Sequence, residues 1–544
     1  MSEYIPKLFQ MMKKYSKEQF VKDMIAGVIV AIIALPLSIA LALASGVSPE
    51  QGIYTAIVAG FVIAFLGGSS VQISGPTAAF ATIVAGIVAT KGMSGLIAAT
   101  VLAGLILILM GLCKFGALIK FIPHTIVTGF TSGIAVTIVI GQLKDFFGLT
   151  FTHAPIETIE KLEECIKTFG TINVTALIVG VVAMAILIVW PKINAKIPAS
   201  LIAVIVTIIL VKVLKLEVNT IGSLYEISSK LPVPALPHFS LELIKDVLPD
   251  AFTIAILAAI ESLLSCVVAD GMVGDKHNPN TELIAQGAGN IASGVFGGIP
   301  ATGAIARTAA NVKNGGRTPI AGIVHALVLL LVLVVLMPYA ALIPMPTIAA
   351  ILFMVAYNMC GWREFVNLVK TAPKSDVLVL LVTFVLTVVF DLVVAIEVGL
   401  ILAAIMFLKR MSDVAEVRSW EYVDQEQDGL TVVPKGTLVY ELEGPMFFAA
   451  ADKFMQVSVD KNTKVVILRM RSVPAMDISA FRVLEEVFHI CKRKNITLLL
   501  SHVTQQPRRM MEKNGFVADV GEENFCANIQ VALARAEELC SKEK

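Results

Sequence analysis

Charged residues are scarce in this sequence of 544 residues: they make up 16% of it, whereas hydrophobic residues make up 56%. Soluble domains carry about 25% charged residues, and disordered chains are polar and poor in aliphatic residues, so both classes are excluded for the chain as a whole. The scarcity is uneven. Residues 1–410 carry 48 of the 85 charged residues, about 12% of that stretch, whereas residues 411–544 carry 37, about 28%. The composition therefore predicts a large membrane part followed by a smaller soluble domain.

Several chemical signatures are also missing. The seven cysteines are scattered, with no Cys-x-x-Cys pair and no metal-ligand spacing, which argues against a disulfide-stapled secreted protein. No Gly-x4-Gly-Lys-Ser/Thr loop is present, so nothing points to ATP as a driving force. A formal net charge of +1 gives no global basic field of the kind that binds nucleic acid. We therefore expect no enzyme, no cofactor and no metal site.

Apolar runs close to the ~20 residues needed to cross a bilayer recur between residues 24 and 410. We divide this transmembrane stretch into fourteen segments: 24–44, 49–66, 71–90, 93–112, 122–142, 172–190, 197–214, 248–270, 281–296, 298–311, 318–337, 345–360, 376–391 and 393–408. Lysines precede the first segment and no cleavage site of the signal-peptide type follows it, so residues 1–23 are expected to be a cytoplasmic N-terminal segment. The loops that this count assigns to the inside hold most of the basic residues, which favours cytoplasmic N- and C-termini.

Two of the fourteen segments, the third and the tenth, differ from ordinary helices. The third begins with Ser74-Gly75-Pro76-Thr77, and the tenth contains Pro300-Ala301-Thr302-Gly303. Proline disfavours helical geometry in the residue before it and suits the first helical turn, so each segment is predicted to be a short extended piece followed by a short helix. These positions are equivalent if the chain consists of two inverted seven-segment halves. Interrupted segments at matching places are typical of a transporter's binding site.

The starts of these two short helices are suited to binding an anion. Helix N-termini that face each other would present free backbone N–H groups and the positive ends of two dipoles. Arg307, five residues after Thr302, would add positive potential. The alternatives are tight helix packing by small residues and an arginine that reaches towards the cytoplasmic interface. The candidate substrate-binding residues are Thr77, Ala78, Ala79, Ala301, Thr302, Gly303 and Arg307.

Glu261 lies deep in the eighth segment and is the candidate coupling-ion residue. A carboxylate at that depth costs roughly 2.5–3.5 kcal/mol on insertion scales, so its default interpretation is functional. Glu261 could carry a proton, or it could bind Na⁺ together with Ser265, one helical turn later, and with Thr302. The alternative is a permanently protonated glutamic acid that forms a hydrogen bond between helices.

A second polar group lies in the ninth segment. Glu282, Gln286 and Asn290 are spaced by four residues, so a helix would place them in one stripe. We interpret this stripe as structural, a set of side chains that hold neighbouring helices together by hydrogen bonds.

The soluble part has the pattern of a small α/β domain. Residues 411–430 are polar and are expected to be a linker, and residues 431–544 form the domain. Alternating apolar runs predict strands at 437–442, 465–470 and 496–501. The stretches predicted to be helices are 450–460, 479–492, 505–514 and 526–540.

The sequence resembles the SulP (sulfate permease) family of anion transporters, whose members end in a STAS domain. The resemblance extends from about residue 20 to 540. Within the family, Ser74–Phe80 and Ala259–Leu264 are similar to the bacterial C4-dicarboxylate member. The most specific stretches are Gln72–Phe80, Ala258–Asp275, Gly297–Asn311 and Gly316–Pro319.

This resemblance implies a polytopic α-helical membrane protein whose fourteen segments form 7+7 inverted repeats, a fold shared with nucleobase permeases. It implies a core domain (segments 1–4 and 8–11), a gate domain (5–7 and 12–14), an elevator-like motion, and a homodimer with cytoplasmic STAS domains. A bicarbonate member carries, at the Glu261 position, an aspartate that helps to bind Na⁺, and the glutamate here favours H⁺. The position of Arg307 matches a basic residue near the anion site of animal relatives. Asp477-Ile478-Ser479-Ala480 matches the turn where free-standing STAS proteins carry a phosphorylatable serine, so Ser479 is a regulatory candidate, with a helix N-cap as the alternative.

We therefore predict a secondary active transporter that moves a small anion (sulfate, bicarbonate or C4-dicarboxylate) across the bacterial cytoplasmic membrane with H⁺ coupling. A Na⁺-coupled symporter and an uncoupled anion exchanger or channel are the alternatives. Two other classes stay open: a nucleobase permease on the same fold, and a regulatory receptor with the STAS domain as its output. The expected partners are the anion, the lipid bilayer, a second copy of the chain and a cytoplasmic partner of the STAS domain.

Overall fold

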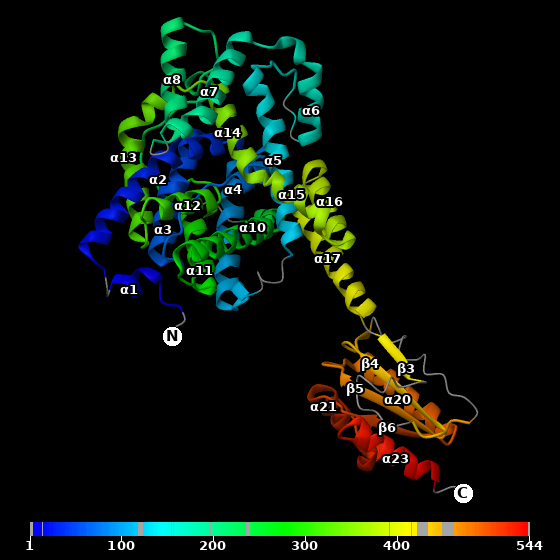
Figure 1. Cartoon of the computed structure of the whole chain (residues 1–544). Coiled ribbons are helices and arrows are strands. Elements are labelled where there is room, and N and C mark those ends of the chain that lie inside the picture. The colour runs from blue at the N-terminus through cyan, green and yellow to red at the C-terminus, as the bar shows by residue number, and fades with distance from the viewer. Residues whose placement is uncertain are drawn as a thin grey trace. The chain divides into compact units, whose positions relative to one another are not determined.

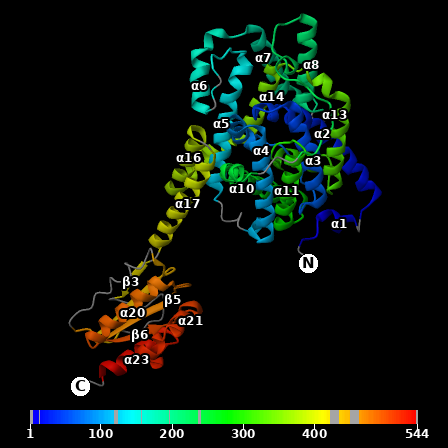
Figure 2. The ribbon, with the colours of Figure 1, turned by 180° about the vertical axis from the view of Figure 1, so that it is seen from behind.

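The chain is described by a computed structural model and divides into two compact units, Met1–Leu400 and Ile401–Lys544 (Figures 1 and 2). The first unit is built of helices, and the second contains a β-sheet with helices on it. The described residues are 4–12, 15–117, 123–153, 155, 157–194, 197–235, 240–390, 392–414, 416–420, 433–448 and 462–541.

The first half of the helical unit contains one interrupted segment. Its elements are α1 (Lys7–Met11), α2 (Lys17–Ala44), α3 (Pro49–Leu66), β1 (Ser74–Gly75), η3 (Ala78–Phe80), α4 (Ala81–Leu112), α5 (His124–Phe147), α6 (Thr158–Lys167), η5 (Phe169–Thr171), α7 (Val174–Ile193), α8 (Ala199–Leu214) and α9 (Ile221–Leu224). Helix α4 is broken at Gly92, where φ is 67° and ψ is −173°. Glycine tolerates this conformation because it has no Cβ. The break at Gly92 divides α4 into two helices, one belonging to the third predicted segment and one to the fourth.

The second half repeats this plan. Its elements are α10 (Leu241–Val273), α11 (Pro279–Val295), β2 (Thr302–Gly303), α12 (Ile305–Lys313), α13 (Ile320–Ala340), α14 (Met345–Cys360), α15 (Trp362–Thr371), α16 (Lys374–Val389) and α17 (Leu392–Val414). All fourteen predicted segments coincide with these elements to within several residues. Eight helices of the described ranges are long and apolar enough to cross a membrane by themselves. The short helices α6 and α15 were not anticipated.

The two interrupted segments contain the extended pieces that the sequence predicts, and these pieces pair with each other, which was not predicted. Strands β1 and β2 pair in antiparallel fashion, with Ser74 opposite Gly303 and Gly75 opposite Thr302. The backbone N–H of Ala304 also donates to the carbonyl of Ile73 at 2.9 Å. The antiparallel direction fits two halves of opposite orientation. It brings the starts of η3–α4 and α12 to one place.

Glycines allow the helices around this crossing to approach closely. Helices α4, α10 and α11 lie side by side (Figures 1 and 2). A Cβ placed on Gly104 of α4 would lie 2.6 Å from the carbonyl oxygen of Gly287 on α11, and a Cβ on Gly287 would lie 2.5 Å from that of Gly104. The two helices therefore touch backbone to backbone, which is the packing that small residues permit between membrane helices.

The N-terminal segment packs on the helical unit. The Lys7 backbone N–H donates to the Gly67 carbonyl at 2.9 Å, and the Lys7 ammonium pairs with Asp275 at 2.9 Å. Burial acts to raise the pKa of Asp275, but hydrogen bonds from Lys7, the Lys276 backbone N–H and Ser70, with the positive charge of Lys7, together hold that pKa below its ordinary value. This pairing ties α1 to the turn between α10 and α11.

The second unit has a five-stranded sheet in the order β3-β4-β5-β6-β7. Strand β3 pairs with β4 in antiparallel fashion, and the other neighbours are parallel. Helices α20 and α21 pack on one face of the sheet, and α23 packs on the other. The elements are β3 (Glu416–Trp420), β4 (Thr437–Glu443), β5 (Val465–Ser472), α20 (Ile478–Arg493), β6 (Thr497–Ser501), α21 (Gln505–Lys513), α22 (Phe516–Val520), η7 (Glu522–Asn524), β7 (Phe525–Cys526) and α23 (Ile529–Ser541).

The three predicted strands and three of the four predicted helices of this unit are present at the expected places. The predicted helix at 450–460 lies outside the described residues. The predicted linker differs from the structure at its start, because α17 continues to Val414 and β3 follows at 416–420. Strand β3 is short and carries charged residues, so its sequence alone does not identify it. Its pairing with β4 defines it.

Candidate functional site

The predicted coupling residue lies against the first interrupted segment. Thr77 Oγ1 donates a hydrogen bond to Glu261 Oε2 at 2.9 Å. Glu261 comes from the middle of α10, and Thr77 is the residue that precedes η3. The Glu261 side chain is only partly buried, so it is open to exchange with solvent or with a ligand. The sequence placed both residues in the site but did not predict their hydrogen bond.

Thr302 lies on the second interrupted segment and is fully buried. Its Oγ1 donates to the Ala258 carbonyl at 3.2 Å and lies 2.7 Å from Ser262 Oγ. Ser262 Oγ also accepts from the backbone N–H of Gly303 at 3.0 Å. These bonds fasten β2 to α10 and occupy the Thr302 hydroxyl. Sequence reasoning missed Ser262, although its position directly after Glu261 was a usable signal.

Ser265, which was predicted to bind Na⁺ together with Glu261, forms a hydrogen bond with Thr308 of α12. Its Oγ donates to Thr308 Oγ1 at 3.4 Å, and Thr308 Oγ1 also accepts from the backbone N–H of Ile73 at 3.0 Å. The three predicted Na⁺ ligands, Glu261, Ser265 and Thr302, thus each form a hydrogen bond with a different neighbour. Within the described ranges no group of three or more histidine, cysteine, aspartate and glutamate side chains could hold a metal ion.

Arg307 is buried beside the first interrupted segment, with 4% of its surface exposed. One terminal nitrogen, Nη2, donates to the Pro76 carbonyl, whereas Nη1 has no hydrogen-bond partner among the described residues. A Cβ on Gly75 would lie 2.7 Å from Nη1, so a larger residue there would push the guanidinium aside. Arg307 and Glu261 are close enough to attract each other electrostatically. The alternative of an arginine that reaches the interface is therefore wrong.

The small residues of the site fall into two groups. Ala301 and Gly303 have backbone N–H groups that are already used: Ala301 donates to Asn290 Oδ1 at 2.8 Å, and Gly303 donates to a serine of α10. Ala78 and Ala79 begin η3, and Ala304 precedes α12; in the described part of the chain neither start receives a hydrogen bond from an N-cap side chain. The first N–H groups of a helix have no partner inside it, so these two starts have donors for a ligand.

Ser479 of the second unit is exposed in the first turn of α20. The helix is capped by Asp477, whose Oδ1 accepts from the backbone N–H of Ala480 at 2.9 Å. The alternative interpretation of Ser479 as the N-cap is therefore wrong. An exposed hydroxyl in a helix's first turn is sterically available, and its modification stays a prediction.

Comparison with known proteins identifies both units. Residues 20–383 match the sulfate permease family, and residues 430–532 match the STAS domain. The putative sulfate transporter YvdB of Bacillus subtilis is 40% identical over 521 residues, which is 94% of this chain and 97% of that protein. The bicarbonate transporter BicA of Picosynechococcus is 31% identical over 515 residues, 90% of each chain.

Solved structures agree with the predicted fold class. The murine Solute Carrier 26 family member A9 anion transporter in the inward-facing state superposes with a TM-score of 0.88 at 19% identity, covering 98% of this chain and 94% of that chain, a likeness that shows the fold alone. The transmembrane domain of a cyanobacterial bicarbonate transporter BicA gives 0.63 at 29% identity, over 72% of this chain and 99% of that one. These proteins are transporters and not enzymes, as predicted. The chain belongs to the sulfate permease family and carries a STAS domain at its C-terminal end.

Proposed function

We propose that the protein is a secondary active transporter that carries a small anion across the membrane, with the anion bound where β1 and β2 cross. The single observation that supports this site most is the buried Arg307, whose Nη1 has no partner among the described residues and lies next to two uncapped helix starts. Free N–H donors and a guanidinium nitrogen that has no hydrogen-bond partner among the described residues suit an anion. Relatives with sulfate and bicarbonate in their names support this substrate class.

The position of Glu261 supports coupling to H⁺. When Glu261 is ionised, its negative charge and the bound anion compete for the same positive potential from Arg307, and they repel each other. Protonation of Glu261 removes that repulsion, so the anion and the proton bind better together than apart. Uptake is then expected to rise as the external pH falls.

Na⁺ coupling is the first alternative. The hydroxyl that lies beside the Glu261 carboxylate is that of Thr77, and an oxygen pair of this kind suits a hard cation. An uncoupled exchanger or channel is the second alternative, and it would use the same anion site without a coupled ion. A nucleobase permease would need more polar side chains for the base than Ala78 and Ala79 supply, and a regulatory receptor would bind without transport.

The wider arrangement is proposed by analogy within the family. We propose an elevator-like motion of the core domain against the gate domain, a homodimer, and a location in the bacterial cytoplasmic membrane with both termini in the cytoplasm. The basic residues of the predicted inner loops support this orientation. The STAS domain would then face the cytoplasm, where a partner or a kinase could reach Ser479.

The proposal is tested by uptake into proteoliposomes that contain the purified full-length protein. Sulfate, bicarbonate and succinate are each supplied with and without Na⁺, and with and without an inward H⁺ gradient. Accumulation of one anion that depends on the H⁺ gradient supports the proposal. Accumulation that requires Na⁺ selects the symporter alternative, and flux that never exceeds equilibrium selects the exchanger or channel. Binding without any flux would favour the receptor.

A further inference from the structure

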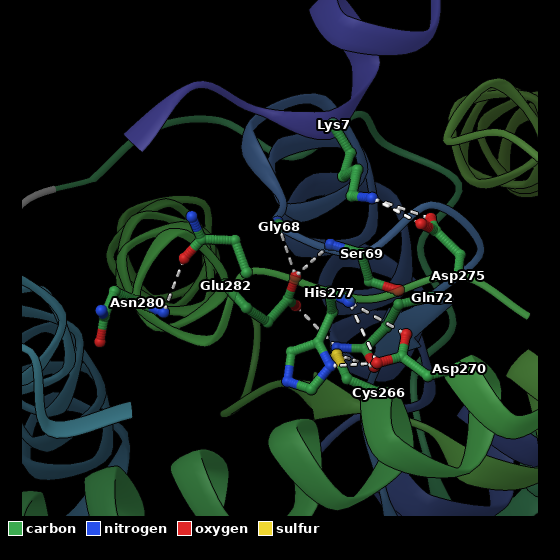
Figure 3. A network of polar contacts seen from close by, with 11 residues as sticks. Lys7, Gly68, Ser69, Gln72, Cys266, Asp270, Asp275, His277, Asn280 and Glu282 are labelled. Carbon is green, nitrogen blue, oxygen red and sulfur yellow. Dashed lines mark hydrogen bonds and ion pairs between the residues drawn. The ribbon is translucent and has the colours of Figure 1, made fainter. Parts of the chain in front are cut away.

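The polar stripe on α11, formed by Glu282, Gln286 and Asn290, does more than join two helices. It begins with a buried carboxylate, that of Glu282, whose two oxygens each accept two hydrogen bonds. Glu282 is completely buried. Its Oε2 accepts from the backbone N–H groups of Gly68 at 2.9 Å and Ser69 at 3.1 Å. Its Oε1 accepts from Gln72 Nε2 at 2.7 Å and Gln286 Nε2 at 2.8 Å. Figure 3 shows Glu282 pointing from α11 towards the connection that leads into β1.

Gln72, which donates to Glu282, also packs against strand β2. Its amide lies directly under β2, since a Cβ on Gly303 would be 2.4 Å from Gln72 Nε2 and 2.8 Å from Oε1. On a third side, Cys266 Sγ of α10 donates to Gln72 Oε1 at 3.1 Å (Figure 3). Glu282 and Cys266 therefore set the orientation of the Gln72 amide. The amide fills the space next to Gly303, where a Cβ would otherwise lie.

The rest of the stripe reaches both crossing strands. Gln286 Nε2, which donates to Glu282, also lies 3.2 Å from Ser74 Oγ on β1. Asn290 holds Ala301, just before β2, by two bonds: it accepts from the Ala301 N–H at 2.8 Å and donates to the Ala301 carbonyl at 2.9 Å. One face of α11 thus supports β1 and β2 from behind, at the place where the two helix starts meet.

We propose that Glu282 is a positioning residue for the anion site: by orienting Gln72 and Gln286 it sets the spacing of the two helix starts, and through that spacing the affinity for the anion. This inference rests on the proposed anion site. A carboxylate charge within the membrane is costly. At Glu282 that cost has a structural function, because an ionised carboxylate accepts hydrogen bonds from four donors at once. A purely structural stripe would affect stability and leave anion affinity unchanged.

Glu282→Gln tests this with little change of shape. The new side-chain carbonyl still accepts from the backbone N–H groups of Gly68 and Ser69, which cannot turn. The new NH₂ group then faces two amide donors, so Gln72 and Gln286 must turn over or lose their bonds. The double variant Glu282→Gln with Gln72→Glu exchanges acceptor and donor and restores a complementary pair. It also keeps the net charge.

A matched control exists in the same unit. Glu164 is also buried, and it accepts from the Thr152 backbone N–H at 2.8 Å and from Thr152 Oγ1 at 2.6 Å, away from the crossing strands. Glu164→Gln therefore removes the charge of a buried, hydrogen-bonded carboxylate without a contact to β1 or β2. Any general effect of such a loss on the melting temperature should appear in both variants.

The measurement is the dissociation constant of the purified full-length protein for sulfate and, in separate titrations, for bicarbonate, together with the melting temperature. We expect Glu282→Gln to weaken binding about tenfold, the lower end of the effect that the loss of an orienting partner has at metal sites. The exchanged pair should recover most of the affinity, and Glu164→Gln should bind as the wild type does. Wild-type affinity in Glu282→Gln, or an exchanged pair that stays weak, overturns the inference.

Two further outcomes keep the test decisive. If Glu282→Gln does not fold, Gln286→Met takes its place, since among the described residues the Gln286 amide donates to Glu282 and Ser74 alone. Weaker binding by that variant supports the inference, and unchanged binding overturns it. If the wild-type protein neither binds nor transports an anion, the proposed function fails and the positioning role fails with it. Wild-type binding with unaltered variants refutes the positioning role alone.

Discussion

The hydrogen bond between Thr77 and Glu261 makes a quantitative prediction about pH. Thr77→Val keeps the shape of the side chain and removes the hydroxyl that lies 2.9 Å from Glu261 Oε2. A hydrogen bond to a charged group contributes about 1.5–3 kcal/mol, and 1.36 kcal/mol corresponds to one pH unit. Because Glu261 is only partly buried, water replaces some of the lost stabilisation. We therefore use the lower end, a shift of about one pH unit.

The direction of the shift follows from which form loses its partner. The hydroxyl stabilises ionised Glu261, so its removal lets Glu261 take up a proton at higher pH. If protonated Glu261 is the form that transports, the pH of half-maximal uptake in Thr77→Val should rise by about one unit. The assay is initial uptake into proteoliposomes across a series of external pH values, at a fixed internal pH.

Two variants complete this experiment. Thr100→Val is the matched control, since Thr100 is buried in α4 and donates only to its own helix, to the Leu96 carbonyl at 2.7 Å. Its pH profile should equal that of the wild type. Uptake by Glu261→Gln should not depend on pH, and the double variant Glu261→Gln with Thr77→Val should have the same flat pH profile. A profile that stays in place in Thr77→Val, or pH-dependent uptake that persists in Glu261→Gln, would refute the reasoning.

Three other predictions concern single residues. Gly75→Ala should weaken anion binding at least severalfold in a titration, because its methyl group would press on the buried guanidinium 2.7 Å away. Gly86→Ala, whose methyl group would meet none of the described residues within 4 Å, should bind normally. Asp477→Ala should destabilise the STAS unit by about 1 kcal/mol through loss of the helix cap, seen as a lower midpoint in urea unfolding, whereas Ser479→Ala should leave the midpoint in place. Burial raises the pKa of the Cys491 thiol to about 11, so the neutral thiol should resist iodoacetamide at pH 8.5 in the native protein and react after denaturation; fast native labelling would contradict this.

The membrane fold could be predicted because its signals are local. Apolar runs of spanning length mark the helices, and the prolines at Pro76 and Pro300 mark the two interruptions. Since the bilayer forces every backbone group to find a partner within the protein, few folds satisfy such a pattern. Elements without an apolar run were missed for the same reason, among them the amphipathic helix α6 and the short strand β3.

The site was predicted only in part, because a residue's role there depends on its partner. Thr302 and Ser265 were expected to face a ligand, yet their hydroxyls bond to Ser262 and Thr308. Arg307 could have lain at the interface or in the site, and burial against the first interrupted segment decided between them. These pairings join residues far apart in the chain, and no spacing within one segment records them.

The sequence by itself determined that this is a multi-pass membrane protein with a soluble C-terminal domain, where its two helix interruptions lie, and which carboxylate stands deep in an apolar segment. Hydrophobicity, proline and charge act on the chain locally, so they can be recognised one segment at a time. Only the tertiary structure decided that Thr77 bonds to Glu261, that Arg307 keeps an unpartnered nitrogen within the described residues, and that the α11 stripe supports both strands. Those contacts depend on how helices from the two halves pack, and packing is a property of the whole fold.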